Sequence, residues 1–173
     1  MPAPSRLVET SSLVVRITII LNRIFFFACV LGLIASFVFP GWFALWISRT
    51  KPAAMVPSVM AGMRELIVIG ITMAIATDRL LVTLNAMIAT VRAGDPFIPA
   101  NAKRLRFIGW CLIALQLSNI PAAELTWFFP AMGNTTPALN LSISGWIAIL
   151  MVFVLSRVFA AGSAMRDDLQ GTV

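Results

Sequence analysis

The chain has 173 residues, of which 60% are hydrophobic and only 12% are charged, and its formal net charge is +6. A soluble domain carries about twice this charged fraction, so the composition excludes an ordinary soluble protein. In a membrane protein, a basic excess reflects orientation and contact with anionic lipid rather than binding to nucleic acid. We therefore expect an all-α integral membrane protein without direct nucleic acid binding, a four-helix bundle that forms a single membrane domain over residues 1–173.

The first apolar run, Ile24 to Ile47, predicts a membrane span at about 21–45. Pro40 interrupts this run near its far end, and Trp42 and Trp46 are typical of the aromatic belt at a membrane interface. A signal peptide also starts with basic residues and an apolar core. This run is longer than such a core and lacks a small-residue cleavage site, so we expect an uncleaved span.

The second apolar run, Met55 to Val91, is too long for one crossing. A helix over the whole run would exceed about 50 Å, whereas the hydrocarbon core is about 30 Å thick. We expect one span at about 62–90 inside a helix that projects beyond the membrane. Two further runs predict spans at about 105–129 and 139–163.

The basic residues are distributed unequally between the two sets of span ends. One set carries Arg6, Arg16, Arg23, Arg79, Arg92, Lys103, Arg104, Arg106, Arg157 and Arg166. The other set carries only Arg49, Lys51 and Arg64. The positive-inside rule therefore places both termini and residues 91–110 of this multi-pass protein in the cytoplasm.

Residues 91–110, VRAGDPFIPANAKRLRFIGW, form a dense and turn-rich segment between two spans. Gly94 is expected to end the preceding helix in the left-handed conformation, and a turn is expected at Pro96. Phe97 is apolar enough to reach back into the membrane interface. Asn101 is expected to cap a helix that begins at residue 102.

Three basic residues, Lys103, Arg104 and Arg106, then fall in the first turns of that helix. Cations are unfavourable there because of the helix dipole, so an anionic group should offset them. Anionic lipid headgroups, the chain's own Asp167 and Asp168, and a cytoplasmic partner are three alternatives. The candidate partner or lipid-headgroup site consists of Arg92, Gly94, Pro96, Phe97, Asn101, Lys103, Arg104 and Arg106.

Two segments carry a recognisable motif, namely GDPFIPANAKRLRFIGW at residues 94–110 and MRDDLQGTV at residues 165–173. They resemble the bacterial DUF2975 family of small four-span membrane proteins, and the layout of the whole chain is similar to that family. Its members are frequently encoded beside a small helix-turn-helix regulator. The resemblance therefore implies a protein of the bacterial inner membrane with a cytoplasmic DNA-binding protein as a partner.

Ionisable or polar residues at membrane depth are functional candidates because they are costly there. The candidates are Asp78, Arg79, Asn119 and Glu124. Asp78 and Arg79 are consecutive and point about 100° apart on a helix, so they do not face each other. Each of these residues can instead be a structural charge or amide at the membrane interface.

The residue types give little support for an enzyme. The chain has no His, which is the commonest general base, and Ser144 in its SISG context has no base beside it. We find no phosphate-binding loop and no cluster of metal ligands in the sequence, so we expect no cofactor, no metal and no catalytic residue. Small residues at four-residue spacing favour close helix packing and allow a homo-oligomer.

The resemblance implies a regulatory or signalling membrane protein. It would hold or release a cytoplasmic helix-turn-helix regulator through residues 92–106 and its C-terminal tail. The alternative is a small oligomeric transporter or channel subunit, with Asp78 and Glu124 along a path through the oligomer. A third alternative is a structural membrane subunit without a ligand.

Overall fold

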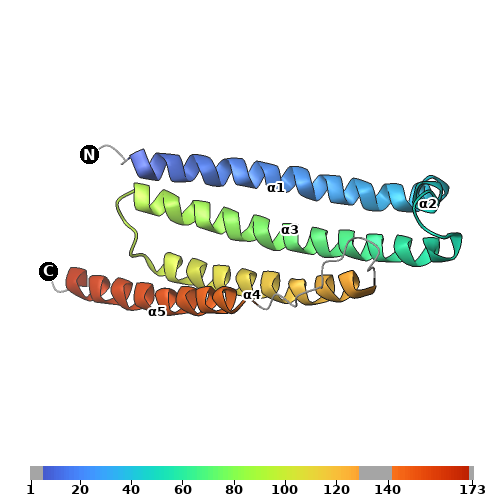
Figure 1. The fold of residues 1–173 in the computed structure, drawn as a ribbon. Coiled ribbons are helices and arrows are strands. Elements are labelled where there is room, and N and C mark those ends of the chain that lie inside the picture. The colour runs from blue at the N-terminus through green and yellow to red at the C-terminus, as the bar shows by residue number, and fades with distance from the viewer. Residues whose placement is uncertain (1–5, 129–141, 172–173) are drawn as a thin grey trace.

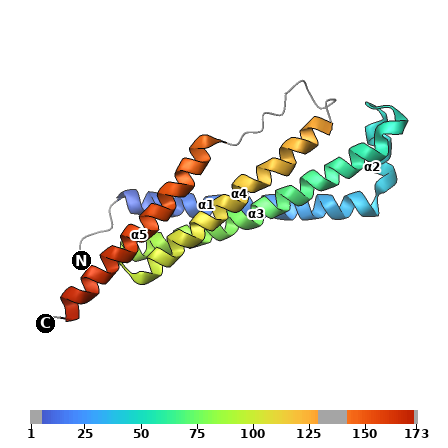
Figure 2. The same ribbon diagram turned by 90° about the horizontal axis from the view of Figure 1, so that it is seen from below.

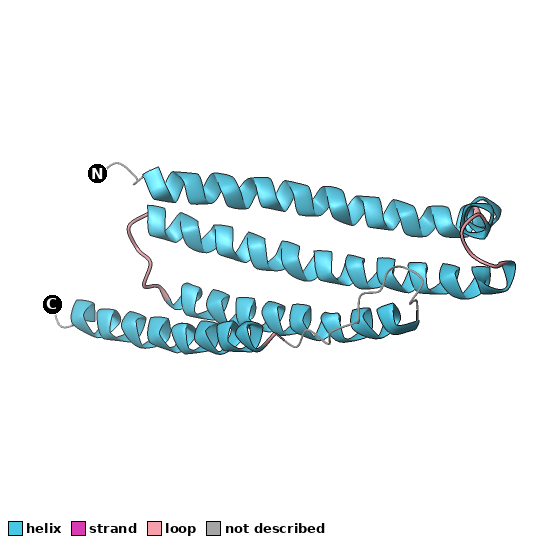
Figure 3. Cartoon of the chain, in the orientation of Figure 1, coloured by secondary structure: helices cyan, strands magenta, loops and turns pink. Residues whose placement is uncertain are grey.

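The computed structural model describes residues 6–128 and 142–171, and these residues confirm the all-α fold (Figures 1 and 3). The helices are α1 (Arg6–Val38), α2 (Pro40–Ser48), α3 (Val56–Arg92), α4 (Pro99–Phe128) and α5 (Ile143–Gly171). A short 3₁₀ turn, η1 (Ala53–Met55), leads into α3. The described part of the chain contains no strand.

The four long helices lie side by side in chain order. α1 packs on α3, α3 packs on α4, and α4 packs on α5 (Figure 1). The start of α1, the loop between α3 and α4, and the end of α5 all lie at the same end of the molecule, which we call the loop end. From this end the helices fan out, as Figure 2 shows.

Three helical segments are long and apolar enough to cross a membrane, namely Glu9–Val38, Ala53–Arg92 and Ile143–Arg166. Large apolar side chains on their outer faces are exposed, for example Leu31 at 65% and Leu150 at 64%. Such faces are unfavourable in water and favourable against lipid. The chain is therefore a membrane protein.

The predicted first span, 21–45, crosses a helix boundary. α1 ends at Val38, and α2 begins at Pro40 and lies across the end of α1 (Figures 1 and 2). Phe39 adopts a non-helical backbone, with φ −122° and ψ 53°, because the ring of a following proline disfavours the helical conformation. The last residues of the predicted span therefore belong to a separate short helix.

The other predicted spans lie within single helices. The span at 62–90 is contained in α3, and the span at 105–129 lies in α4 except for residue 129, which is outside the described residues. The span at 139–163 lies in α5 from Ile143 onward, and its first residues are outside the described part.

Arg64 of α3 closes the end of α1. The carbonyl oxygen of Ser36 has no helical donor four residues later, since Pro40 lacks an N–H group. Arg64 Nη2 donates to this oxygen at 2.7 Å, and Arg64 Nε donates to Ser36 Oγ at 3.2 Å. Its guanidinium carbon lies 4.0 Å from the centre of the Phe37 ring. A cation at a helix C-terminus also interacts favourably with the helix dipole.

Candidate functional site

The loop at residues 93–98 begins with a regular helix end. Gly94 has a φ of 80°, which confirms the predicted left-handed residue. Its N–H donates to the Val91 carbonyl at 3.1 Å, and the Asp95 N–H donates to the Thr90 carbonyl at 3.1 Å. These two bonds form the Schellman motif, which satisfies carbonyls that the end of α3 would otherwise leave free.

Asn101 does not cap a helix at residue 102, so that prediction is wrong. α4 begins earlier, at Pro99, because proline has the backbone angle that a first helical position requires and needs no donor there. Asn101 instead lies in the first turn and is 1% exposed. Its Nδ2 donates to Thr90 Oγ1 at 2.7 Å and to the Pro96 carbonyl at 2.8 Å. The side chain therefore joins α4 to the end of α3 and to the loop.

Arg104 supports Asn101 from the next turn of α4. Its Nη1 donates to Asn101 Oδ1 at 2.8 Å, so both ends of the buried amide are hydrogen-bonded. Lys103 and Arg106 are exposed on the same helix. Of the three cations in the first turns of α4, Arg104 therefore makes a contact within the protein, and Lys103 and Arg106 are exposed charges.

The loop is also fixed to α5. Asp95 forms an ion pair with Arg166. The Phe97 ring lies 5.1 Å from the Phe159 ring, centre to centre, and covers Gly162, where a Cβ atom would lie 3.1 Å from Phe97 Cδ1. We expected Phe97 to reach the membrane interface, and its ring is 45% exposed. Its contact with α5 was not predicted.

The expected contact between the loop and the acidic tail falls outside the described side chains, which do not include those of Asp167 and Asp168. The observed ion pair has the opposite polarity, with the acid in the loop and the cation on α5. On the other side, Arg92 Nη2 donates to Ser12 Oγ of α1. Side chains in and around the loop thus reach α1, α3, α4 and α5.

Among the side chains that the structure describes, the polar candidates at membrane depth do not form one site. Asp78 Oδ1 accepts a hydrogen bond from Arg23 Nε of α1 at 2.9 Å, and the two side chains form an ion pair. Nearby, Asn22 Nδ2 donates to the Ala74 carbonyl at 2.9 Å. Arg79 is exposed and follows Asp78 in α3. Both residues line a cavity of about 420 Å³, together with Asn22 and Arg23 of α1.

Asn119 is exposed on α4, well along the helix from the loop. Glu124 belongs to α4, and its side chain is not among those that the structure describes. Among the described residues, no group of three or more His, Cys, Asp or Glu side chains is placed to bind a metal ion.

Comparison with known proteins gives one match. The sequence pattern of a family described as "Protein of unknown function (DUF2975)" matches residues 48–173. The matched part includes α3, α4, α5 and the loop at residues 93–98, and begins at the last residue of α2. No curated protein and no solved structure matches the chain.

Proposed function

The chain belongs to the DUF2975 family, and we propose that it is a regulatory protein of the bacterial inner membrane. In this proposal it binds a cytoplasmic helix-turn-helix transcription regulator at its loop end. It has four spans, both termini lie in the cytoplasm, and the regulator alone contacts DNA. The chain needs no catalytic residue or cofactor for this role.

The observation that supports the proposal is the fixed shape of the loop at residues 93–98. The Schellman end at Gly94, the buried amide of Asn101 and the ion pair of Asp95 each restrain it. Orientation in the membrane depends on the number of basic residues and not on their exact positions. A docking surface does depend on shape, because a loop ordered in advance loses less entropy on binding.

The chemistry of this end favours an acidic partner surface. Lys103 and Arg106 are exposed on α4, and Phe97 in the preceding loop exposes part of its ring. A basic surface steers an acidic surface toward it and rejects other basic surfaces. An exposed aromatic ring can add an apolar anchor at the centre of such an interface.

The loop end lies on the cytoplasmic side in this proposal. The start of α1, the loop and the end of α5 share one end of the molecule (Figure 1). Ten of the thirteen basic residues fall on that side by their positions in the sequence. The positive-inside rule therefore supports the cytoplasm for this end.

The alternative of a transporter or channel subunit gains no support from Asp78. Its carboxylate is paired with Arg23 at 2.9 Å, so a structural role accounts for it. A homo-oligomer stays a prediction, since no second copy is needed for the loop surface to form.

The proposal is tested by the distribution of the regulator between membrane and soluble fractions of cells. Asn101→Ala removes the contacts that shape the loop and leaves every charge in place. Asn119→Ala is the matched control, the same substitution at an exposed position of the same helix. We expect the regulator to move to the soluble fraction with Asn101→Ala only. Equal distributions with both variants, at equal amounts of membrane protein, would exclude the proposal.

A further inference from the structure

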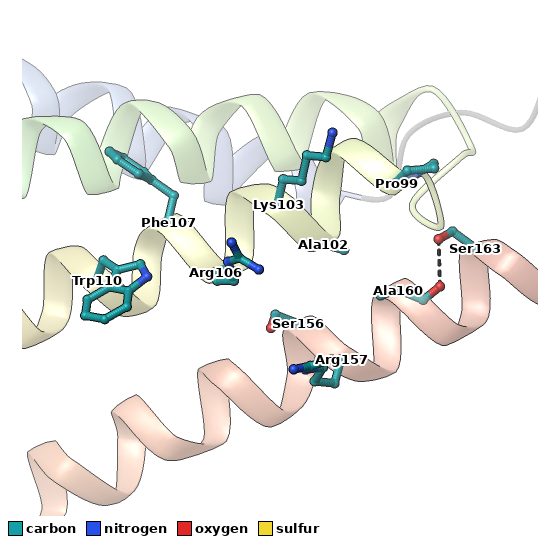
Figure 4. Close-up of a pocket in the computed structure, with 10 residues that line it drawn as sticks. All are labelled: Pro99, Ala102, Lys103, Arg106, Phe107, Trp110, Ser156, Arg157, Ala160 and Ser163. Carbon is teal, nitrogen blue, oxygen red and sulfur yellow. Dashed lines mark hydrogen bonds between the residues drawn. The ribbon is translucent and has the colours of Figure 1, made fainter.

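A groove of about 690 Å³ lies between α4 and α5, close to the loop end (Figure 4). α4 contributes Lys103, Arg106 and Trp110 to its walls, and α5 contributes Arg157 and Ala160. The groove is open between the two helices because its lining residues on α5 include small side chains. This feature is separate from the loop contacts described above.

The groove is cationic. Three of its ten lining residues are basic and none is acidic. Arg106 and Arg157 come from opposite walls, and Lys103 lies at the rim with its amine turned away from α5 (Figure 4). None of the three forms an ion pair with a described residue, since the described pairs involve Arg23 and Arg166.

Arg157 lies within a segment that is apolar enough to cross a membrane, Ile143–Arg166. Its neighbours Val154 and Val158 are 56% and 54% exposed, so this side of α5 presents an apolar surface to its surroundings. A cation at such a position is costly unless an anion reaches it. Inorganic phosphate has no apolar part to match this surface, whereas the phosphate of a lipid headgroup approaches from the membrane side.

The other lining residues match the rest of a lipid. Trp110 is 60% exposed and Phe107 is 46% exposed, and both follow the cations along α4 toward the membrane interior. The hydroxyl of Ser156 donates to the Phe153 carbonyl of its own helix at 2.7 Å. Its proton is therefore not available to a ligand, and the basic side chains are the charged donors of the groove.

We propose that this groove binds an anionic membrane phospholipid. Arg106 and Arg157 contact the headgroup phosphate, and the flexible Lys103 turns in from the rim. Trp110 and Phe107 pack against the acyl chains. The groove shares Lys103 and Arg106 with the proposed docking surface, whereas Arg157, Trp110 and Ala160 belong to the groove alone, so variants of these three residues test lipid binding separately from the proposed function.

The test is a titration of the purified full-length protein in neutral detergent, with lipid binding followed by native mass spectrometry. Phosphatidylglycerol is expected to bind at lower concentration than phosphatidylcholine. Arg157→Gln and Arg106→Gln should each weaken phosphatidylglycerol binding about fivefold, the factor that corresponds to about 1 kcal/mol for one cation near an anionic headgroup. Arg49→Gln, an exposed cation outside the groove, is the matched control and should leave binding unchanged.

A second variant tests the groove without removing a charge. Ala160→Leu places a larger side chain in the groove and should weaken phosphatidylglycerol binding while leaving the fold intact, because Ala160 is exposed. Equal binding of the two lipids to the unaltered protein would overturn the proposal. Normal binding by both Arg157→Gln and Ala160→Leu, or an equal loss with Arg49→Gln, would also overturn it.

One further arm separates a lipid from a free anion. Inorganic phosphate at the same concentrations is expected neither to compete with phosphatidylglycerol nor to raise the thermal unfolding temperature of the protein. Competition by inorganic phosphate would identify the groove as a general anion site and would contradict the lipid assignment.

Discussion

The side-chain amide of Asn101, in the first turn of α4, donates a hydrogen bond to the hydroxyl oxygen of Thr90 in the last turn of α3, at 2.7 Å. The Thr90 hydroxyl donates in turn to the Met87 carbonyl at 2.7 Å. This chain of polar contacts joins two helices that are connected by the loop at residues 93–98. It explains how this short loop keeps one shape.

Asn101→Ala should lower the free energy of unfolding by about 1–3 kcal/mol, because it leaves buried partners without their hydrogen bonds. Asn119→Ala, on the same helix and exposed, should change it by less than about 0.5 kcal/mol. Thermal unfolding of both variants in the same detergent is the measurement. A similar change for both would show that the buried amide contributes nothing specific to the loop.

Gly94→Ala should destabilise the protein by about 1 kcal/mol, since the position has a φ of 80° and an L side chain is strained there. Gly32→Ala is the matched control, a glycine inside α1 with nothing within 4 Å of its Cβ position. That change should be neutral or stabilising because alanine favours a helix. Circular dichroism during heating tests both, and a stabilised Gly94→Ala would contradict the observed helix end.

The ion pair of Arg23 and Asp78 predicts a compensating pair of substitutions. Asp78→Asn leaves Arg23 without its anion at membrane depth and should lower stability by about 1 kcal/mol. Arg23→Gln combined with Asp78→Asn should recover part of this loss, which a double-mutant cycle measures. If Asp78→Asn instead abolished solute flux in vesicles without changing stability, the transporter alternative would be correct.

The topology is tested at Ala100, an exposed residue in the first turn of α4. In a chain with Cys29 and Cys111 replaced, Ala100→Cys should be protected from a membrane-impermeant maleimide in intact cells. Arg49→Cys, in the loop that follows α2, should be labelled in the same cells. Labelling of residue 100 from outside would reverse the orientation of the whole protein.

Features that depend on residues close together in the chain could be predicted from the sequence. The helix class follows from composition and run length, and the left-handed Gly94 follows from its place between a helix and a proline-rich turn. Pro40 signalled a break in the first apolar run, although the change of direction at α2 was not predicted.

Contacts between distant residues could not be predicted in this way. Asp78 and its partner Arg23 are 55 positions apart, and Asp95 and its partner Arg166 are 71 apart. Asn101 was expected to cap its own helix, whereas its amide donates to Thr90 of α3 and to Pro96 of the loop, and these contacts depend on how the loop folds back. The groove forms where α4 packs on α5, so its combination of Arg157 with Lys103 and Arg106 could not be predicted from the sequence.

Binding of a cytoplasmic regulator at the loop end is tested most directly by photo-crosslinking in living cells. One photoreactive residue is placed at Ala100 and, in a second variant, one is placed at Trp42. The first lies at the loop end, and the second lies in α2 at the other end of α1. We expect a covalent adduct with a helix-turn-helix regulator from position 100 and none from position 42. No adduct from position 100, or equal adducts from both positions, would contradict this expectation.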